Sequence, residues 1–429
     1  MQFATKVGQA GKCLNTTNLP GQVNRVPRGR GSRIARQSAH EDGKIVTAIG
    51  SAQCHAERSD FHTHTEALGT LAGIPLKMKK MPTVYAVYMI SVIICSCTTY
   101  VGMFADVYVH SDDLEHTMTN IRVLVATASV VWIYFACRLR QHSIERAMDL
   151  TDSFTWEDLP NRDADTGHLT AAGWIPRINM ISSGAAVAVI LFHFTQSTIR
   201  IVTNHETVFI AWYPFDWTVS PFYELVNISQ CLTSLLILGI ICGFPALVTA
   251  LIAVACAQFE KLKAAILDIR QQHITPYHGQ EDEQVHTAAD CDLQAKLNAC
   301  IRHHQDIMAF MQQLEDALNV SLCGHFLISL ATICFTAFSV VTNWGDYADM
   351  SQGVFGYVFF VSNVFLICWF GTRLTQHAES VRDAACGCDW VGTPVPFQRC
   401  LMFIIATANK QFQLTAGKFV PVSNLTMMN

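Results

Sequence analysis

Six long apolar runs constrain this chain more than any other feature. Each is close to the roughly 20 residues that a helix needs to cross a bilayer. They lie near residues 82–107, 118–138, 178–200, 223–256, 321–342 and 353–371. Only 15% of the 429 residues are charged, whereas a soluble protein has about a quarter. We therefore expect an all-α integral membrane protein. A shorter run from Cys400, CLMFIIATA, is too short to span by itself.

Lys and Arg are sorted between alternate connecting segments, and this predicts the orientation of the chain. Residues 1–81 hold twelve of them, and the segments 138–177, 257–302 and 371–400 hold five, five and three. The segments between them contain almost no Lys or Arg, and the two exceptions, Arg122 and Arg200, lie at the edges of runs. We expect a multi-pass plasma-membrane protein with a cytosolic N-terminus. This orientation argues against a G-protein-coupled receptor, whose N-terminus lies outside.

Two of the runs continue as amphipathic helices beyond the membrane. After the run 223–256, Phe259, Leu262 and Ile266 recur at helical spacing. A helix of about 48 residues is roughly 70 Å long, more than twice the roughly 30 Å of hydrocarbon. The apolar stripe before the run 321–342 likewise predicts that this helix extends beyond the membrane. The pattern leaves open whether these faces pack within one chain or between subunits.

Polar side chains fall on one face near the outer ends of three runs. Such groups at membrane depth usually face the bundle or a cavity. Together they predict an apolar ligand pocket with a few hydrogen-bonding groups, and the alternative is ordinary bonding between helices. The predicted ligand-binding residues are His193 and Gln196, then Tyr223, Asn227 and Gln230, then Phe355, Tyr357 and Asn363.

The stretch AWYPFDWTVSPFYEL, residues 211–225, separates two apolar runs and is rich in aromatic residues. Charge sorting places it outside the membrane. It is expected to form an extracellular lid over the pocket, whose aromatic walls suit small volatile ligands. The alternative is that its rings are interfacial anchors. The predicted lid residues are Trp212, Tyr213, Phe215, Trp217 and Phe222.

The chain carries no motif of catalysis or of metal binding. It has no Gly-rich phosphate loop, no His-Glu-x-x-His and no Ser nucleophile elbow. His62 with His64, and Cys386 with Cys388, lack the further ligands of a closed metal site. We expect no enzymatic activity, cofactor, metal or nucleic-acid partner.

Four stretches resemble the insect odorant receptor family. They are WYPFDWTVSPFYELVNISQ from Trp212, ACAQFEKLKAAILDIRQQH from Ala255, CIRHHQDIMAFMQQLEDALN from Cys300, and ESVRDAACGCDWVGTPVPFQRCLMFIIATANKQFQLTAGKFVPVS from Glu379. The last is the most specific, and the resemblance covers about residues 82–425.

The resemblance implies a seven-transmembrane-type bundle that forms a ligand-gated cation channel. Subunits of this family assemble as tetramers, usually with a shared co-receptor, so the implied partners are a small volatile odorant, the co-receptor in a heterotetramer, and the lipid bilayer. The short linker after residue 271 is similar to that of an odorant-binding subunit, not the co-receptor. The implied subunit anchor includes Phe259, Leu262, Ile266, Trp390, Phe403, Ile404 and Phe412.

The domain organisation follows from the runs and the resemblance. We expect a disordered cytosolic tail at 1–80, four transmembrane helices in 81–256, cytosolic extensions and a linker at 257–320, two further spans in 321–371, an anchor region at 372–417, and the start of a pore helix at 418–429. Phe419 and Val420 would begin the pore wall. The sequence stops before this seventh helix is complete, so either it is cut short or a chain of this length does not conduct.

Two other functions stay open at this point. A gustatory receptor of the same superfamily would differ in its ligand. A membrane transporter would usually show internal repeats and broken helices at the midplane, and here there is one interruption, at Gly243 and Pro245.

Overall fold

The computed structural model describes residues 83–154, 168–271, 283–342, 347–388, 390–410 and 412–428. The tail predicted at 1–80 and most of the predicted linker, residues 272–282, lie outside the described residues. The described part is almost entirely helical, with one two-stranded hairpin near the end.

The six predicted spans are confirmed as six helices long and apolar enough to cross a membrane, counted over the described residues. They are α3 (Thr83–Val109), α4 (Leu114–Leu139), α6 (Ala171–Ile199), α7 (Phe222–Gln271), α8 (Glu283–Thr342) and α9 (Tyr347–Gly387). Helix α4 begins where Asp113 accepts a hydrogen bond from the His116 amide, and α6 begins in the same way at Thr170. Shorter elements are α5 (Gln141–Ser153), the π-helical turn η2 (Arg200–Asn204) and α10 (Val395–Ala408).

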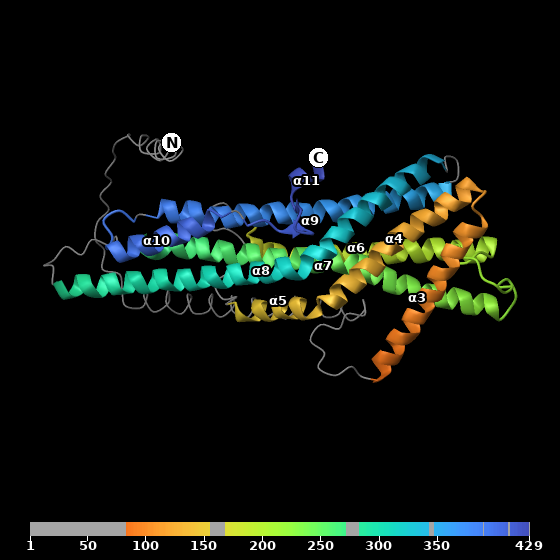
Figure 1. Cartoon of the computed structure of the whole chain (residues 1–429), viewed down its shortest axis with the longest axis horizontal. Helices are drawn as coiled ribbons and strands as arrows, with labels where there is room; N and C mark the ends of the chain where they lie inside the picture. The colour runs from red at the N-terminus through yellow and green to blue at the C-terminus, as the bar shows by residue number, and fades with distance from the viewer. Residues whose placement is uncertain are drawn as a thin grey trace, which may run out of the picture. The chain divides into compact units, whose positions relative to one another are not determined.

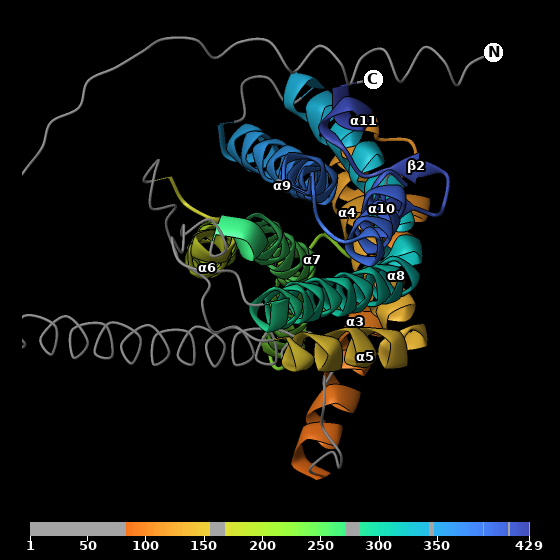
Figure 2. The ribbon, with the colours of Figure 1, turned by 90° about the vertical axis from the view of Figure 1, so that its left-hand side faces the viewer.

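Helix α7 lies at the centre of the bundle, packed along α6, α8, α9 and α3 (Figures 1 and 2). Its most apolar stretch is 78% buried inside the chain, whereas those of the other five spans are 11–44% buried. The apolar faces of the outer helices are therefore left to contact lipid or another subunit. Helices α4 and α5 pack along α8.

Helices α7 and α8 continue well past the length of a membrane span, as predicted, and α9 does so as well. They contain 50, 60 and 41 residues, and α10 packs against the extended parts of α8 and α9. We call this the α10 end, and the opposite end, with the loop 205–221, the loop end. Phe259, Leu262 and Ile266 are buried among neighbours of the same chain.

Residues after α10 form a small hairpin against α8, where a pore helix was predicted to begin. Strand β1 (Thr415–Ala416) pairs antiparallel with β2 (Val420–Pro421), and a short helix α11 (Asn424–Met428) follows. Gly417 and Lys418 take left-handed conformations, with φ of 65° and 64°, and these residues make the turn. Phe419 is 89% exposed and Val420 is 42% exposed.

Candidate functional site

A cavity of about 180 Å³ lies between the helices of the bundle toward the loop end. Helices α3, α4, α6, α7, α8 and α9 all contribute to its wall, together with Val208, Phe209 and Ile210 of the loop that follows η2. The wall is mainly aliphatic and aromatic, as expected of a site for small apolar ligands. Its polar residues are Thr119, Asn120, Arg122, Thr127, His193, Arg200, Ser234, Thr332, Thr336 and Gln352.

Most of the polar groups that line this cavity are engaged by neighbouring groups of the protein. His193 Nε2 lies 3.1 Å from Ser234 Oγ, and that hydroxyl donates to the Gln230 carbonyl. Thr127 donates to carbonyls of its own helix at Val123 and Leu124. These groups are satisfied without a ligand.

Asn120 of α4 is the exception among the lining amides. Its Nδ2 donates to Asp106 Oδ2 at 2.8 Å and to the Met103 carbonyl at 3.4 Å. Its Oδ1 is buried and has no hydrogen-bond partner. An unpartnered buried acceptor costs about 1–3 kcal/mol. A ligand hydroxyl or amine that reached this oxygen would remove that cost.

Arg122 ties α4 to the two helices on the opposite wall of the cavity. It donates to Ser339 Oγ of α8 at 3.1 Å and to Gln352 Oε1 of α9 at 3.3 Å. Close to it, a Cβ at Gly353 would lie 2.7 Å from Val340 Cγ2, so glycine is what lets α9 approach α8 here. The hydrogen bonds of Arg122 and the close approach of α9 to α8 at Gly353 together hold these three helices in place.

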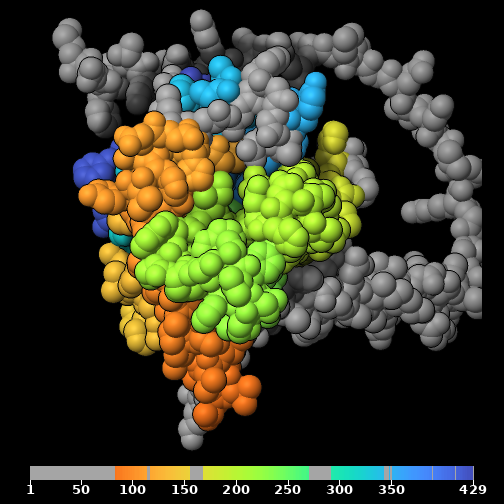
Figure 3. Space-filling model, turned by 90° about the vertical axis from the view of Figure 1, so that its right-hand side faces the viewer, coloured from red at the N-terminus to blue at the C-terminus, as the bar shows by residue number. Residues whose placement is uncertain are grey.

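The loop 205–221, which we call the capping loop, lies across the loop end beside α3 and α4 (Figure 3, yellow-green). The side chain of Gln230, on α7, attaches this loop to the bundle by hydrogen bonds. The Gln230 side chain accepts from the Phe209 amide at 2.8 Å, and donates to the Phe209 carbonyl at 3.2 Å and to Tyr213 Oη at 3.1 Å. Gln230 is fully buried.

The capping loop is also attached to α3. The Trp212 amide donates to the Gly102 carbonyl at 2.9 Å. A Cβ at Gly102 would lie 3.1 Å from both Ala211 Cβ and the Trp212 oxygen. Further along, rings pack on one another: Tyr213 on Phe215, Phe215 on Phe222, and Trp217 on Tyr223. Burial raises the pKa of Tyr213, although the Gln230 hydrogen bond opposes this rise.

Of the eight predicted ligand-binding residues, His193 and Phe355 line the cavity. Gln230 anchors the capping loop, as described above. Tyr223 reaches the Glu206 carbonyl at 3.2 Å and so ties the start of α7 to that loop. The amides of Asn227 and Asn363 donate to carbonyls of their own helices, and Tyr357 is 40% exposed. Gln196 does not line the cavity, and its side chain is half-buried.

The five predicted lid residues lie in or beside the capping loop, but the cavity wall is made by the residues before them. Trp212, Phe215 and Phe222 are 40–50% exposed. Of the predicted anchor residues at the α10 end, Ile404 is buried in the chain, Phe412 is half-buried, and Trp390 and Phe403 are 39% and 73% exposed.

The resemblance implied that the second span, α4, lines the pocket, but no α4 residue was predicted; the structure shows that α4 supplies Thr119, Asn120, Arg122 and Thr127. A signal was available, because Thr119, Val123 and Thr127 recur at a spacing of four and Asn120 lies beside the first of them. Thr332 and Thr336 of α8, which also line the cavity, are four residues apart as well.

A family model described as the 7tm odorant receptor matches residues 113–428. Among curated proteins, Odorant receptor 2a of Drosophila melanogaster is 26% identical over 243 residues, which is 55% of this chain and 60% of that protein. The Odorant receptor coreceptor of Ooceraea biroi is 27% identical over 125 residues, covering 29% of this chain and 26% of that protein. Both matches span less than two thirds of the relative's own length.

A solved structure of the insect olfactory receptor OR5 from Machilis hrabei, in complex with eugenol, has a similar fold. The TM-score is 0.62 at 13% identity, and the match covers 87% of this chain and 95% of that one. A second OR5 structure matches with a TM-score of 0.60 at 14% identity, covering 86% and 94%. The family model covers well over half of the chain, and the fold agrees with it, so this membrane-spanning helical protein belongs to the insect 7tm odorant receptor family.

Proposed function

We propose that the chain is an odorant-binding subunit of an odorant-gated, non-selective cation channel in olfactory signalling. Membership of the odorant receptor family supports this proposal. So does a mainly apolar cavity on which six helices and the capping loop converge. A ligand that fits one arrangement of these elements better than another shifts the population toward it.

The observation that carries the ligand class is that Asn120 lines a mainly apolar cavity of about 180 Å³ and that its buried Oδ1 has no hydrogen-bond partner. An engineered apolar cavity of about 150 Å³ in another protein binds benzene, so this space suits a ligand with one ring or a short chain. Asn120 would accept a hydrogen bond from a hydroxyl on it. The OR5 complex holds eugenol, a substituted phenol, in a similar fold.

The test uses a pair of ligands of matched size, p-cresol and p-xylene, with the full chain purified in detergent. Wild-type protein should bind p-cresol about 2- to 10-fold more tightly because of one net hydrogen bond. Asn120→Leu should remove most of that preference and leave p-xylene binding nearly unchanged.

Asn227→Leu is the matched control. Asn227 is also buried with an unpartnered Oδ1, but it does not line the cavity, so this variant should keep the preference for p-cresol. Equal losses for both ligands in Asn120→Leu would show that Asn120 does not contact the hydroxyl. If neither ligand binds the wild-type chain, the cavity is not the site for this ligand class. Ligand-evoked current, recorded in cells that also express the co-receptor, tests the channel function separately.

Assembly with the odorant receptor co-receptor in a heterotetramer is part of the same proposal. It is supported by the similarity to the Ooceraea biroi coreceptor and by Met402 and Phe403, exposed by 67% and 73% on α10. These two residues are adjacent, and contiguous exposed apolar surface of this kind often marks a site that a partner covers. Copurification with the co-receptor should weaken in a Met402→Ser and Phe403→Ser variant, and unchanged copurification would contradict a role for this face.

We also propose the plasma membrane as the location, with the N-terminus in the cytosol and the capping loop outside. The sorting of Lys and Arg supports this orientation. An epitope inserted in the capping loop should bind antibody on intact cells, and one at the N-terminus should bind only after permeabilisation. The opposite pattern would reverse the orientation.

A further inference from the structure

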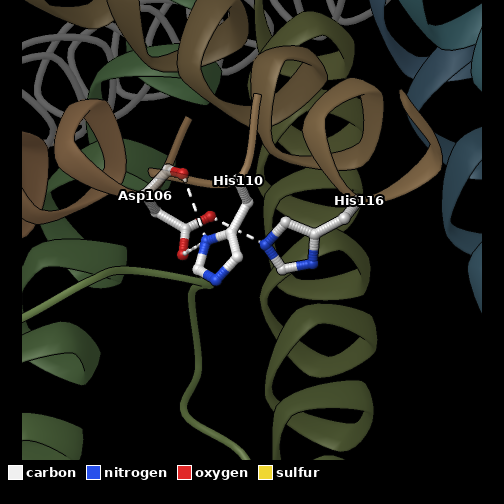
Figure 4. A group of neighbouring side chains, drawn as sticks. All are labelled: Asp106, His110 and His116. Carbon is white, nitrogen blue, oxygen red and sulfur yellow. Dashed lines mark hydrogen bonds and ion pairs between the residues drawn. The ribbon is translucent and has the colours of Figure 1, made fainter. Parts of the chain in front are cut away.

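Three potential metal ligands meet where α3 connects to α4 (Figure 4). Asp106 lies in the last turn of α3, His110 in the connection, and His116 in the first turn of α4. His110 Nδ1 is 3.1 Å from Asp106 Oδ1, and His116 Nε2 is 2.8 Å from Asp106 Oδ2. One ligand atom from each residue lies within 4.8 Å of the other two.

The short connection holds these side chains together. The Asp113 amide and the Thr117 hydroxyl both donate to the His110 carbonyl, at 3.0 Å and 2.8 Å. Asp113 also caps α4 by accepting from the His116 amide at 3.2 Å. Both His residues are therefore fixed relative to Asp106 by the backbone of the turn and not only by their own contacts.

The chemistry of the cluster suits a transition-metal ion. Two imidazole nitrogens and one carboxylate oxygen form a ligand set that Zn²⁺ uses in sites with an open fourth position. Tetrahedral ligand atoms on Zn²⁺ stand about 3.4 Å apart, so small side-chain movements would suffice here. The side chain of Asp106 is 5% exposed, whereas those of His110 and His116 are 46% and 32% exposed. An ion can thus reach a buried carboxylate from solvent.

Two further observations favour a cation at this place. No Lys or Arg occurs between residues 104 and 121, where Asp112 and Asp113 add acidic charge. Asn120 donates to Asp106 Oδ2 at 2.8 Å. That bond is the kind of outer contact that orients a ligating carboxylate.

We propose that Asp106, His110 and His116 bind a divalent transition-metal ion of the zinc class, with water in the fourth position. The ring nitrogens that face Asp106 must be free of protons to bind it, so each proton moves to the other ring nitrogen or to solvent. The ion links the end of α3 to the start of α4. Asn120 is the positioning residue, and it also lines the cavity.

The primary test measures metal binding and does not depend on channel activity. The full chain is purified with an affinity tag that lacks histidine, stripped with a chelator, and titrated with Zn²⁺ against a competing dye. One high-affinity site is expected per chain. His110→Gln and His116→Gln should each weaken that site at least 10-fold, because Gln keeps a donor for Asp106 but has no imidazole nitrogen. Asn120→Ala should weaken it by about 10- to 100-fold.

His205→Asn is the control, because His205 lies at the same end but outside the cluster. Its left-handed backbone, with φ of 53°, tolerates Asn, and Zn²⁺ affinity should not change. Thermal unfolding with and without Zn²⁺ guards against misfolding. His116→Gln should melt like the wild-type chain without Zn²⁺ and should lose the Zn²⁺-dependent rise. Equal Zn²⁺ affinity in the wild type and both His variants would overturn the proposal, leaving a metal-free hydrogen-bonded cluster.

Discussion

Phe192 of α6 and Phe355 of α9 stack face to face at the cavity wall, with ring centroids 4.1 Å apart and planes 21° from parallel. At another point along the same two helices, Trp174 and Trp369 meet edge to face at 5.5 Å. Helix α6 otherwise packs along α7. The stacked pair therefore forms part of the cavity wall between two helices that otherwise make few contacts with each other.

Replacing Phe355 with Ala should enlarge the cavity and change which ligands it prefers. The variant loses an aromatic pair worth about 0.5–1.5 kcal/mol and gains the volume of a ring. Binding of p-cresol should weaken, while a bulkier phenol such as eugenol should gain relative to it. Phe365→Ala is the control, since Phe365 is 50% exposed on the same helix and does not line the cavity. An unchanged ligand ranking in Phe355→Ala would place the ligand elsewhere.

Gly102→Val should loosen the capping loop. The added side chain would press against Ala211 and Trp212, which leave only 3.1 Å for a Cβ, and overpacking of this kind costs about 1–3 kcal/mol. Hydrogen exchange of residues 205–221 should become faster. Gly184→Val makes the same change in α6, where nothing lies within 4 Å of the new Cβ. If exchange in the loop is equally slow in both variants, α3 does not hold it.

Alkaline pH should release the capping loop through Tyr213. Burial raises its pKa above the usual value of 10.0, so the folded loop favours the protonated phenol. The stability from this group is present below pH 10 and is lost as pH rises through the higher folded pKa. Tyr213→Phe should remove that part of the alkaline loss, followed as loop exchange from pH 9 upward. The same alkaline profile in both proteins would exclude Tyr213 as its source.

Glu315→Ala should free the C-terminal hairpin from α8. Glu315 Oε2 accepts from the Thr415 amide at 2.8 Å, and Oε1 accepts from the Thr415 hydroxyl. Hydrogen bonds to a charged group contribute about 1.5–3 kcal/mol, so trypsin should cleave after Lys418 more rapidly.

Asp316→Ala is the control for that experiment. It removes only the pair with Lys418, whose charged atoms are 3.8 Å apart and well exposed, and such pairs contribute little. Cleavage that is faster in Asp316→Ala than in Glu315→Ala would contradict the role of Glu315.

The spans could be predicted because run length and charge sorting are properties of the chain alone. The aromatic stretch 211–225 predicted an extracellular lid, and that role stays a prediction. The contact of the capping loop with the cavity could not be predicted. It depends on a tertiary hydrogen bond between the Phe209 amide and Gln230, 21 residues later in the chain. The same limit applies to Asn120. Its spacing marks a face of α4, but only the packed bundle shows that its oxygen lacks a partner.

The metal cluster shows the opposite case, in which the pattern was local and was still passed over. Asp106 and His110 are four residues apart in one helical turn, and His116 follows a tight connection. Pairs such as His62 with His64 are close in sequence, whereas the third proposed ligand, His116, comes from the next helix.

Helix α8 runs without a break from Glu283 to Thr342, so a single helix connects the cavity to the C-terminal hairpin. Thr332 and Thr336 line the cavity, while Asn319, on the same rod, accepts the Gly417 amide of the hairpin at 2.8 Å. About 20 Å of helix separates the two places. A continuous helix that rotates at one point rotates along its length. A ligand that rotated α8 about its axis would therefore also displace the C-terminal segment attached to it.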